Sequence, residues 1–426
     1  MSTEETPGTG TPGPLWPAML PPRRQGDDSL CAISAKGIRV RFADGHERLD
    51  GSSGLWNANL GYGNSAIAEA VSEALTTASY LSSWSFENSY TRQAAAALVE
   101  LVGPQQFSRV IFSTSGGAAN EVCMKIARHF HVLRNEPERK IILGLRDGFH
   151  GLTYGAFALT DAQLGQRMYG VDRRFVGHVA ANDPAAISDA LAKLRGRVSA
   201  IVVEPVLGTG AIPLSDEYVA ELLRLRKEHG FLLVADEITT GFARIGNAMF
   251  ESQGWPEAPD LVITSKALTN GTMAASAIVV SRAVAQKFHD FDTVLGHAET
   301  QSGTAVAGAA IIATIAEHQR YDSILLSSNL AKRIDVVLAE LVEREPLVVG
   351  ATGRGCLRAL QLANAQGPLE RADVDRLVAA IRAAGALVHP GPSCIQLVPA
   401  LIYSDDDLAE LADRVSAGLT LFANER

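Results

Sequence analysis

The sequence has little of what marks several protein classes. Only four of its 426 residues are cysteines, at positions 31, 123, 356 and 394, and they form no C-x-x-C pair. This spacing argues against a zinc site or a disulfide framework and favours a reducing cytoplasm. No apolar run reaches the roughly 18 residues of a membrane-spanning helix. The N-terminus also lacks the apolar core of a secretion signal.

Positive charge is scarce as well. The chain has 38 Lys and Arg against 47 Asp and Glu, a net charge of −9. This balance argues against a protein that binds nucleic acids or anionic membranes in general. What is present is an ordinary globular composition, with 47% hydrophobic and 20% charged residues. Because a domain usually has about 100–200 residues, the length predicts two domains.

Strands and helices are expected to alternate in the middle of the chain. Short apolar runs at 200–203, 231–235 and 261–264 are typical of strands buried on both faces. Such alternation predicts a mostly parallel sheet covered by helices. The expected division is a disordered tail (1–14), an N-terminal segment that joins the small domain (15–65), a large domain (66–315) and a small α+β domain (316–426).

A polar residue follows each of the three apolar runs. Glu204 follows the first, Asp236 the second and, after one serine, Lys266 the third. In an open α/β sheet, ligands bind beyond the carboxyl ends of the strands. We therefore expect the three side chains to surround one crevice, where a buried lysine amine next to carboxylates can act as a nucleophile.

Pyridoxal phosphate needs such a set of partners. A lysine forms a Schiff base with it, an aspartate pairs with its ring nitrogen, and N–H groups at a helix start bind its phosphate. Lys266, Asp236 and the turn Ser115-Gly116-Gly117 before an expected helix match these needs. Singly, each has an ordinary interpretation as a solvated lysine, a loop carboxylate or a turn. Together, and in this order, they predict the cofactor.

Six segments resemble the class III aminotransferases, and the resemblance extends from about residue 15 to 422. They are DGSSGLWNANLGYGN (50–64), FSTSGGAANEVCMKIAR (112–128), DGFHG (147–151), DEITTGFARIG (236–246), PDLVITSKALTNG (259–271) and GHAETQSGTAVAGAA (296–310). The resemblance implies the α/β fold type I of pyridoxal-phosphate-dependent transferases, with a large domain and a smaller α+β domain. It also implies transamination between a small-molecule amine donor and a carbonyl acceptor.

The resemblance implies a role for each matching residue. Lys266 would hold the cofactor and carry protons, Asp236 would pair with the ring nitrogen, and Gly116 and Gly117 would bind the phosphate beside Ser115. Phe149 would stack on the ring, His150 would support its turn, Glu204 would lie near the ring, and Thr239 would lie near the ring's 3′ oxygen. Thr300 would reach the phosphate of a neighbouring subunit, which implies a homodimer with shared sites. Trp56 would line the substrate pocket or belong to the core.

The sequence departs from the family pattern at several of these positions. Gly117 replaces a hydroxyl residue, so one phosphate contact is lost, and Phe149 and Thr239 replace the usual tyrosine and glutamine. His389 replaces an arginine that grips a substrate carboxylate, and histidine is no equivalent replacement. We expect a substrate without an α-carboxylate there, such as an aldehyde, a ketone or a modified peptide end. In the alternative, Arg354 or Arg244 binds the carboxylate.

Segments SGGAAN and HGLTYGAFALTD also resemble the daptide-type aminotransferases, which aminate the C-terminal carbonyl of ribosomal peptides. Specialised biosynthesis is therefore expected. The fold alone does not decide which bond breaks, so a racemase, an aminomutase or a decarboxylase stays open, as does a cofactor-binding protein without turnover. No metal, nucleic acid or membrane partner is expected.

Overall fold

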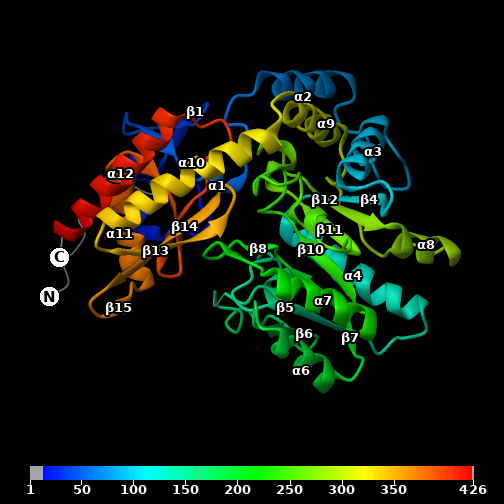
Figure 1. Cartoon of the computed structure of the whole chain (residues 1–426). Coiled ribbons are helices and arrows are strands. Elements are labelled where there is room, and N and C mark those ends of the chain that lie inside the picture. The colour runs from blue at the N-terminus through cyan, green and yellow to red at the C-terminus, as the bar shows by residue number, and fades with distance from the viewer. Residues whose placement is uncertain (1–12, 163, 425–426) are drawn as a thin grey trace.

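The computed structural model describes residues 13–162 and 164–424. Most of the tail predicted to be disordered, residues 1–12, lies outside the described residues. The chain forms a larger unit around a central sheet and a smaller unit that contains the C-terminal helices (Figure 1). Among the described helices, none is long and apolar enough to cross a membrane.

Seven strands form the central sheet in the order β4-β12-β11-β10-β7-β5-β6. Their bounds are β4 Phe107–Ser113, β5 Ile141–Leu145, β6 Val176–Val179, β7 Val198–Val203, β10 Leu232–Asp236, β11 Leu261–Thr264 and β12 Ser276–Ser281. β12 alone runs antiparallel to its neighbours. The predicted mostly parallel sheet is thus confirmed. The sequence interpretation missed β6 and β12, which lie outside the motif segments.

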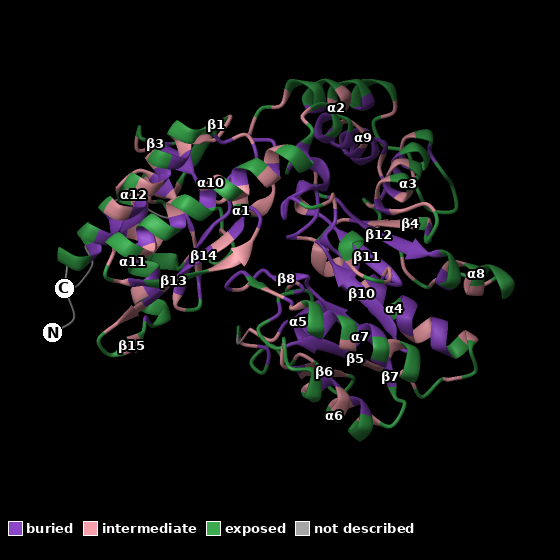
Figure 2. Ribbon diagram, viewed as in Figure 1, coloured by how far each residue is buried: buried purple, intermediate pink, exposed green. Residues whose placement is uncertain are grey.

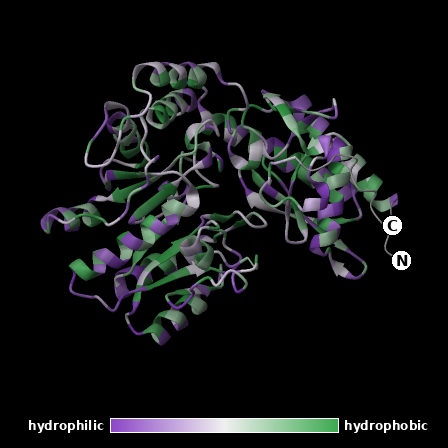
Figure 3. Cartoon of the chain, turned by 180° about the vertical axis from the view of Figure 1, so that it is seen from behind, coloured by the Kyte–Doolittle hydropathy of each residue, from purple (hydrophilic) through white to green (hydrophobic). Residues whose placement is uncertain are grey.

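Alternate residues of the strands pack on opposite faces of the sheet. Val234, Ile263 and Ile278 share a hydrophobic cluster with α4 (Gly116–Leu133), on the face that also carries α8 (Arg282–Asp290). On the other face, Leu233 packs in one cluster and Val262 in another. That face is covered by α3 (Ser89–Val102), α6 (Pro184–Leu194), α7 (Asp216–His229) and α9 (Ala305–Arg320). The strands are buried and the outward helix faces exposed (Figure 2), and hydropathy follows the same division (Figure 3).

The remaining elements of the larger unit lie around this sheet. α2 (Ser65–Thr77) packs on α9, and its N-cap is Asn64, as predicted. α5 (Tyr154–Leu159) contacts α4, and β8 (Val206–Leu207) pairs with β9 (Ile212–Pro213). Because α5 is a single short stretch without a long periodic pattern, the sequence interpretation did not include it.

The N-terminal segment and the C-terminal region form the smaller unit together. The hairpin of β2 (Arg39–Phe42) and β3 (Glu47–Asp50) continues a sheet from β1 (Ala32–Lys36) to β16 (Ala386–Leu387), since β3 pairs with β16. A second sheet has the strands β13 (Val348–Arg354), β14 (Leu357–Asn364), β15 (Gly367–Pro368), β17 (His389–Gly391) and β18 (Cys394–Leu397). The helices are α10 (Ser323–Arg344), α11 (Arg371–Ala383) and α12 (Asp405–Asn424).

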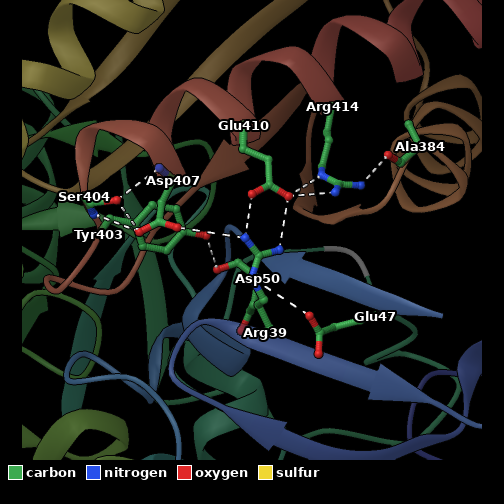
Figure 4. A network of polar contacts seen from close by, with 9 residues as sticks. All are labelled: Arg39, Glu47, Asp50, Ala384, Tyr403, Ser404, Asp407, Glu410 and Arg414. Carbon is green, nitrogen blue, oxygen red and sulfur yellow. Dashed lines mark hydrogen bonds and ion pairs between the residues drawn. The ribbon is translucent and has the colours of Figure 1, made fainter.

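A polar network fastens the N-terminal sheet to α12 (Figure 4). Both terminal nitrogens of Arg39 donate to the two carboxylate oxygens of Glu410, and Arg414 holds the same carboxylate from the next turn of the helix. Tyr403 donates to the backbone oxygen of Asp50 at 2.9 Å. Because Asp50 begins the segment that carries Trp56, this network fixes the base of that segment.

Candidate functional site

The three predicted strand-end residues leave the sheet at the same edge. β7, β10 and β11 are neighbours, with Val203 opposite Ala235 and Asp236 opposite Ile263. Glu204 and Asp236 are buried, with exposed fractions of 3% and 2%. Lys266 opens the 3-10 helix η4 (Lys266–Thr269) one residue beyond Ser265. The parallel register of the strands therefore brings Glu204, Asp236 and Lys266 to one place, as the sequence predicted.

Asp236 is held in a fixed orientation by three donors. Its Oδ2 accepts from the Asn120 amide at 2.9 Å and lies 2.7 Å from Nδ1 of His150, while its Oδ1 accepts from the Ile238 N–H at 3.2 Å. Burial alone lowers the pKa of His150, but the hydrogen bond to Asp236 and the charges of Asp236 and Glu204 outweigh it and raise that pKa. His150 and Asn120 thus hold the Asp236 carboxylate in place from within the protein.

Asn120 was missed as a site residue in the sequence interpretation. It is fully buried on the first turns of α4, and its amide also reaches the carbonyls of Gly116 and His150, at 3.1 Å each. One side chain thus joins Asp236 to the glycine turn and to the segment with Phe149. The signal was present, since Asn120 ends the motif segment SGGAAN, but no role had been attached to it.

The surroundings of Lys266 lower the pKa of its amine. Burial is the main cause that lowers its pKa to about 8, with Arg244 adding to the effect and the charges of Glu204 and Asp236 opposing it. Its Nζ lies 4.3 Å from the centre of the Trp56 ring. Its backbone is left-handed, with φ +49°, a conformation that non-glycine residues rarely hold without a local constraint.

Trp56 stands on an unusual turn. Ser53, Gly54, Leu55 and Trp56 all have positive φ, between 49° and 64°. For L-residues such a run costs about 1–2 kcal/mol per residue, so something must hold it. Asp50 does so, because its carboxylate accepts from the N–H groups of Ser52 and Gly54 and from the Tyr62 hydroxyl, at 2.8, 2.7 and 2.6 Å.

His389 lies against Trp56 on the side of the smaller unit. The two ring centres are 4.7 Å apart in an edge-to-face arrangement. Burial lowers the pKa of His389 to about 4, and the nearby Lys266 and Arg371 act in the same direction. His389 is therefore neutral at physiological pH. Trp56 also packs against an apolar cluster that includes Val206 and Cys394.

Glu204 connects Phe149, which is predicted to stack on the cofactor ring, to the smaller unit. Its Oε1 accepts from the Phe149 N–H and its Oε2 from the Gly208 N–H, both at 2.9 Å. Gln396 of β18 in turn donates to the Gly208 carbonyl. Burial raises the pKa of Glu204, His150 opposes this, and Asp236 adds to it. The Phe149 side chain itself is 42% exposed.

Thr239 lies close to the same loop. A Cβ placed on Gly208 would be 3.1 Å from Oε2 of Glu204 and 3.4 Å from Cγ2 of Thr239. The Thr239 hydroxyl is buried without a hydrogen-bond partner in the part of the chain that the structure describes. A buried hydroxyl without a partner costs free energy, so this one is suited to donate a hydrogen bond to an oxygen of a bound molecule.

The turn before α4 has the geometry of an anion-binding helix start. Ser115 is the N-cap, and its hydroxyl and carbonyl accept from the N–H groups of Ala118 and Ala119. The helix itself offers no acceptor to the N–H groups of Gly116 and Gly117. Gly151 lies directly beside this turn, since a Cβ on it would meet the Gly117 Cα at 2.5 Å. Ser115, the two glycines and the segment 149–153 thus lie together at the start of α4.

Thr300 is the one predicted site residue that the structure does not bring to the others. It is exposed on the loop between α8 and α9, and its carbonyl accepts from the Tyr80 hydroxyl at 3.0 Å. Glu299 anchors this loop by accepting from the Thr114 N–H at 3.1 Å, next to the α4 turn.

Each alternative arginine is engaged elsewhere through its terminal nitrogens, while the buried Nε of Arg244 has no hydrogen-bond partner among the described residues. Arg244 is fully buried, where it donates to the Pro399 carbonyl and the Asn59 side chain. Arg354 is paired with Glu251 at 2.5 Å. Among the described residues, no group of three or more His, Cys, Asp or Glu could hold a metal ion.

The comparisons with known proteins identify the family. The family described as "Aminotransferase class-III" matches residues 22–419. The chain belongs to the class-III aminotransferases. It is 30% identical to the acetylornithine aminotransferase of Bacillus subtilis, over 90% of this chain and 94% of that one. An amine transaminase from an uncultivated Pseudomonas species, solved in its pyridoxal-phosphate-bound form, has a TM-score of 0.90 at 27% identity and covers 97% of this chain and 99% of its own.

A second solved structure agrees with this assignment. The (S)-enantioselective ω-transaminase of Thermomicrobium roseum has a TM-score of 0.89 at 26% identity, with 96% of both chains covered. The fold is thus that of pyridoxal-phosphate-dependent transaminases, and the cofactor is pyridoxal phosphate. The residues present fit that group: Asp236 is an oriented carboxylate, Lys266 an amine of lowered pKa, Thr239 an unpaired buried hydroxyl, and the α4 turn an anion site.

Proposed function

We propose that this aminotransferase acts on amines and carbonyl compounds that carry no carboxylate next to the reacting carbon. The observation behind the proposal is the wall formed by Trp56 and His389. It is aromatic, and His389 is uncharged because its pKa is lowered to about 4. Arg371, which acts on His389 electrostatically, is itself paired with Asp375 at 2.9 Å. The two side chains of this wall thus offer no pair of charged donors for the bidentate contact that arginine makes with a carboxylate.

Bound pyridoxal phosphate supplies an electron-poor ring that accepts the electron pair of the broken C–H bond. The residues do the rest in this proposal. Asp236, held by Asn120 and His150, would pair with the ring nitrogen of the cofactor. Lys266 would take the proton from the substrate carbon that bears the amino group and deliver it to the C4′ carbon of the cofactor, which its pKa of about 8 permits near neutral pH. Phe149 would cover the ring, and Gly116 and Gly117 would bind the phosphate.

The substrate proposal is tested with pairs of donors that differ only by the carboxylate, such as phenylalanine and 2-phenylethylamine. We expect kcat/KM to favour the decarboxylated member. In His389→Arg, the preference should move toward the carboxylated member by about tenfold or more, the usual worth of a hydrogen-bonded charge pair. A strong preference of the unchanged enzyme for the carboxylated member would overturn the proposal.

We further propose a homodimer in which Thr300 serves the phosphate site of the partner. The support is its exposed loop and the apolar segment next to it. Trp84 and Phe86 are 70% and 73% exposed. Ser83 donates to the Ser302 carbonyl at 2.9 Å, so this segment and the Thr300 loop form one surface. Exposed apolar patches of this kind mark protein–protein contacts.

The biological setting is a proposal from the sequence. The resemblance of SGGAAN and HGLTYGAFALTD to aminotransferases that modify peptide ends supports a role in specialised biosynthesis, with an aldehyde or ketone acceptor that includes a peptide C-terminal carbonyl. All four cysteines are free thiols, which supports a reducing cytoplasm. Conversion of a peptide aldehyde to its amine, followed by mass spectrometry, tests the acceptor. Failure with every peptide carbonyl, alongside turnover of small aldehydes, would contradict it.

A further inference from the structure

The hydroxyl of Thr153 lies beside the first turn of α4. A Cβ placed on Gly117 would be only 3.3 Å from Oγ1 of Thr153. Gly117 has no positive φ, so its backbone would accept a side chain, and the Thr153 hydroxyl is the nearest atom to that side chain. The backbone contact of Gly151 with Gly117 brings the Thr153 segment this close. Thr153 therefore places a hydroxyl oxygen next to the space that a side chain of residue 117 would enter.

The Thr153 hydroxyl does not cap the helix that follows it, although its position would normally give it that role. Thr153 is the N-cap of α5, and a threonine there usually accepts from the N–H groups of the first turn. Within the described chain it makes no such bond. Glu121 of α4 replaces it, because its Oε1 accepts from the N–H groups of Gly155 and Ala156 at 2.9 and 3.4 Å. A carboxylate from another helix thus caps α5 and releases the Thr153 hydroxyl.

We propose that Thr153 is a phosphate-binding residue of the cofactor site, which compensates for the missing side chain of Gly117. The hydroxyl donates to the phosphate alongside the N–H groups of Gly116 and Gly117, and Glu121 keeps it available by capping α5. The inference rests on the cofactor assignment but not on the proposed substrate. A hydroxyl donor to a doubly charged phosphate forms a charge-assisted bond, stronger than one between neutral groups.

The test measures cofactor affinity by titrating the apoenzyme and recording absorbance, with both pyridoxal phosphate and phosphate-free pyridoxal. Thr153→Ala should weaken the binding of pyridoxal phosphate about tenfold and leave that of pyridoxal unchanged. Thr153→Ser should restore the affinity. In Thr153→Ala with Gly117→Ser, the new hydroxyl occupies the vacated space, so affinity for pyridoxal phosphate should also return. Thr76→Ala, an exposed threonine on α2, is the matched control.

The outcomes separate the inference from the function. If Thr153→Ala binds pyridoxal phosphate as tightly as the unchanged protein, Thr153 is no ligand. If it weakens both compounds equally, its role is structural and the inference is wrong. If the unchanged protein binds neither compound, the cofactor assignment itself fails, and this is visible before any variant is made.

Discussion

At the residue scale, the orientation of Asp236 depends on a side chain outside the usual list of catalytic groups. Asn120 donates to Asp236 and to two backbone carbonyls from a fully buried position. Hydrogen bonds to charged groups are worth about 1.5–3 kcal/mol. Asn120→Ala should therefore lower kcat about 10- to 100-fold. The ring-nitrogen environment should change with it, visible as a shift of the cofactor absorbance.

The matched control for this variant is Asn329→Ala, an exposed asparagine on α10. It should leave kcat and the spectrum unchanged. If Asn120→Ala loses thermal stability but keeps its kcat and spectrum, the contact of Asn120 with Asp236 has no part in the chemistry.

The pKa of Lys266 gives a prediction on pH. Burial lowers this pKa from its ordinary range to about 8, so the amine loses its proton as pH rises through about 8. Only the neutral amine attacks a carbonyl. The rate constant for capture of pyridoxal phosphate by the apoenzyme should rise with pH and level off above about 8. Stopped-flow absorbance measures it, and a rise that continues toward pH 10 would show that Lys266 keeps an ordinary pKa.

At the element scale, the left-handed turn at 53–56 places Trp56 over Lys266. Gly54→Ala would bring a Cβ within 2.5 Å of the Tyr62 hydroxyl, which holds Asp50. We expect a lower kcat/KM for aromatic amines and a loss of about 2–4 kcal/mol in the free energy of unfolding, from strain plus overpacking. Denaturant unfolding and steady-state kinetics measure the two effects.

Gly63→Ala is the control for backbone strain alone. Its φ is also positive, at 72°, but nothing lies within 4 Å of the added Cβ. It should cost about 1–2 kcal/mol and leave kcat/KM intact. Equal effects of both variants on kcat/KM would mean that the contact with Tyr62 does not position Trp56.

The sequence predicted the elements whose patterns are local. Asn64 and Ser215 begin helices as their N-caps, and the apolar run 261–264 is β11. It could not show the turn at 53–56, because nothing in the letters S-G-L-W marks four left-handed residues held by Asp50. Nor could it show that Glu121 caps α5, since that contact joins two helices. The strand ends were predictable because parallel register is a general rule, whereas these contacts depend on packing.

At the scale of the whole molecule, the proposal of shared sites predicts complementation. Lys266→Ala removes the reacting amine, and Thr300→Ala removes the contact that would cross to the partner. In a mixed dimer, one site carries both changes and the other carries neither, so half of the normal activity per mixed dimer should return. Unfolding and refolding the two variants together, then assaying activity, measures this. Thr300 acting within its own chain would give no recovery above the sum of the separate variants.

The most direct measurement of the central claim is the absorbance of the purified protein before and after amine donors are added. If Lys266, Asp236 and the α4 turn form a transaminating site, the cofactor band should convert to that of the aminated cofactor with a donor alone, and a carbonyl acceptor should reverse it. Lys266→Ala should show no such conversion. A band that no donor converts, with carbon dioxide release or racemisation of the donor instead, would contradict the account.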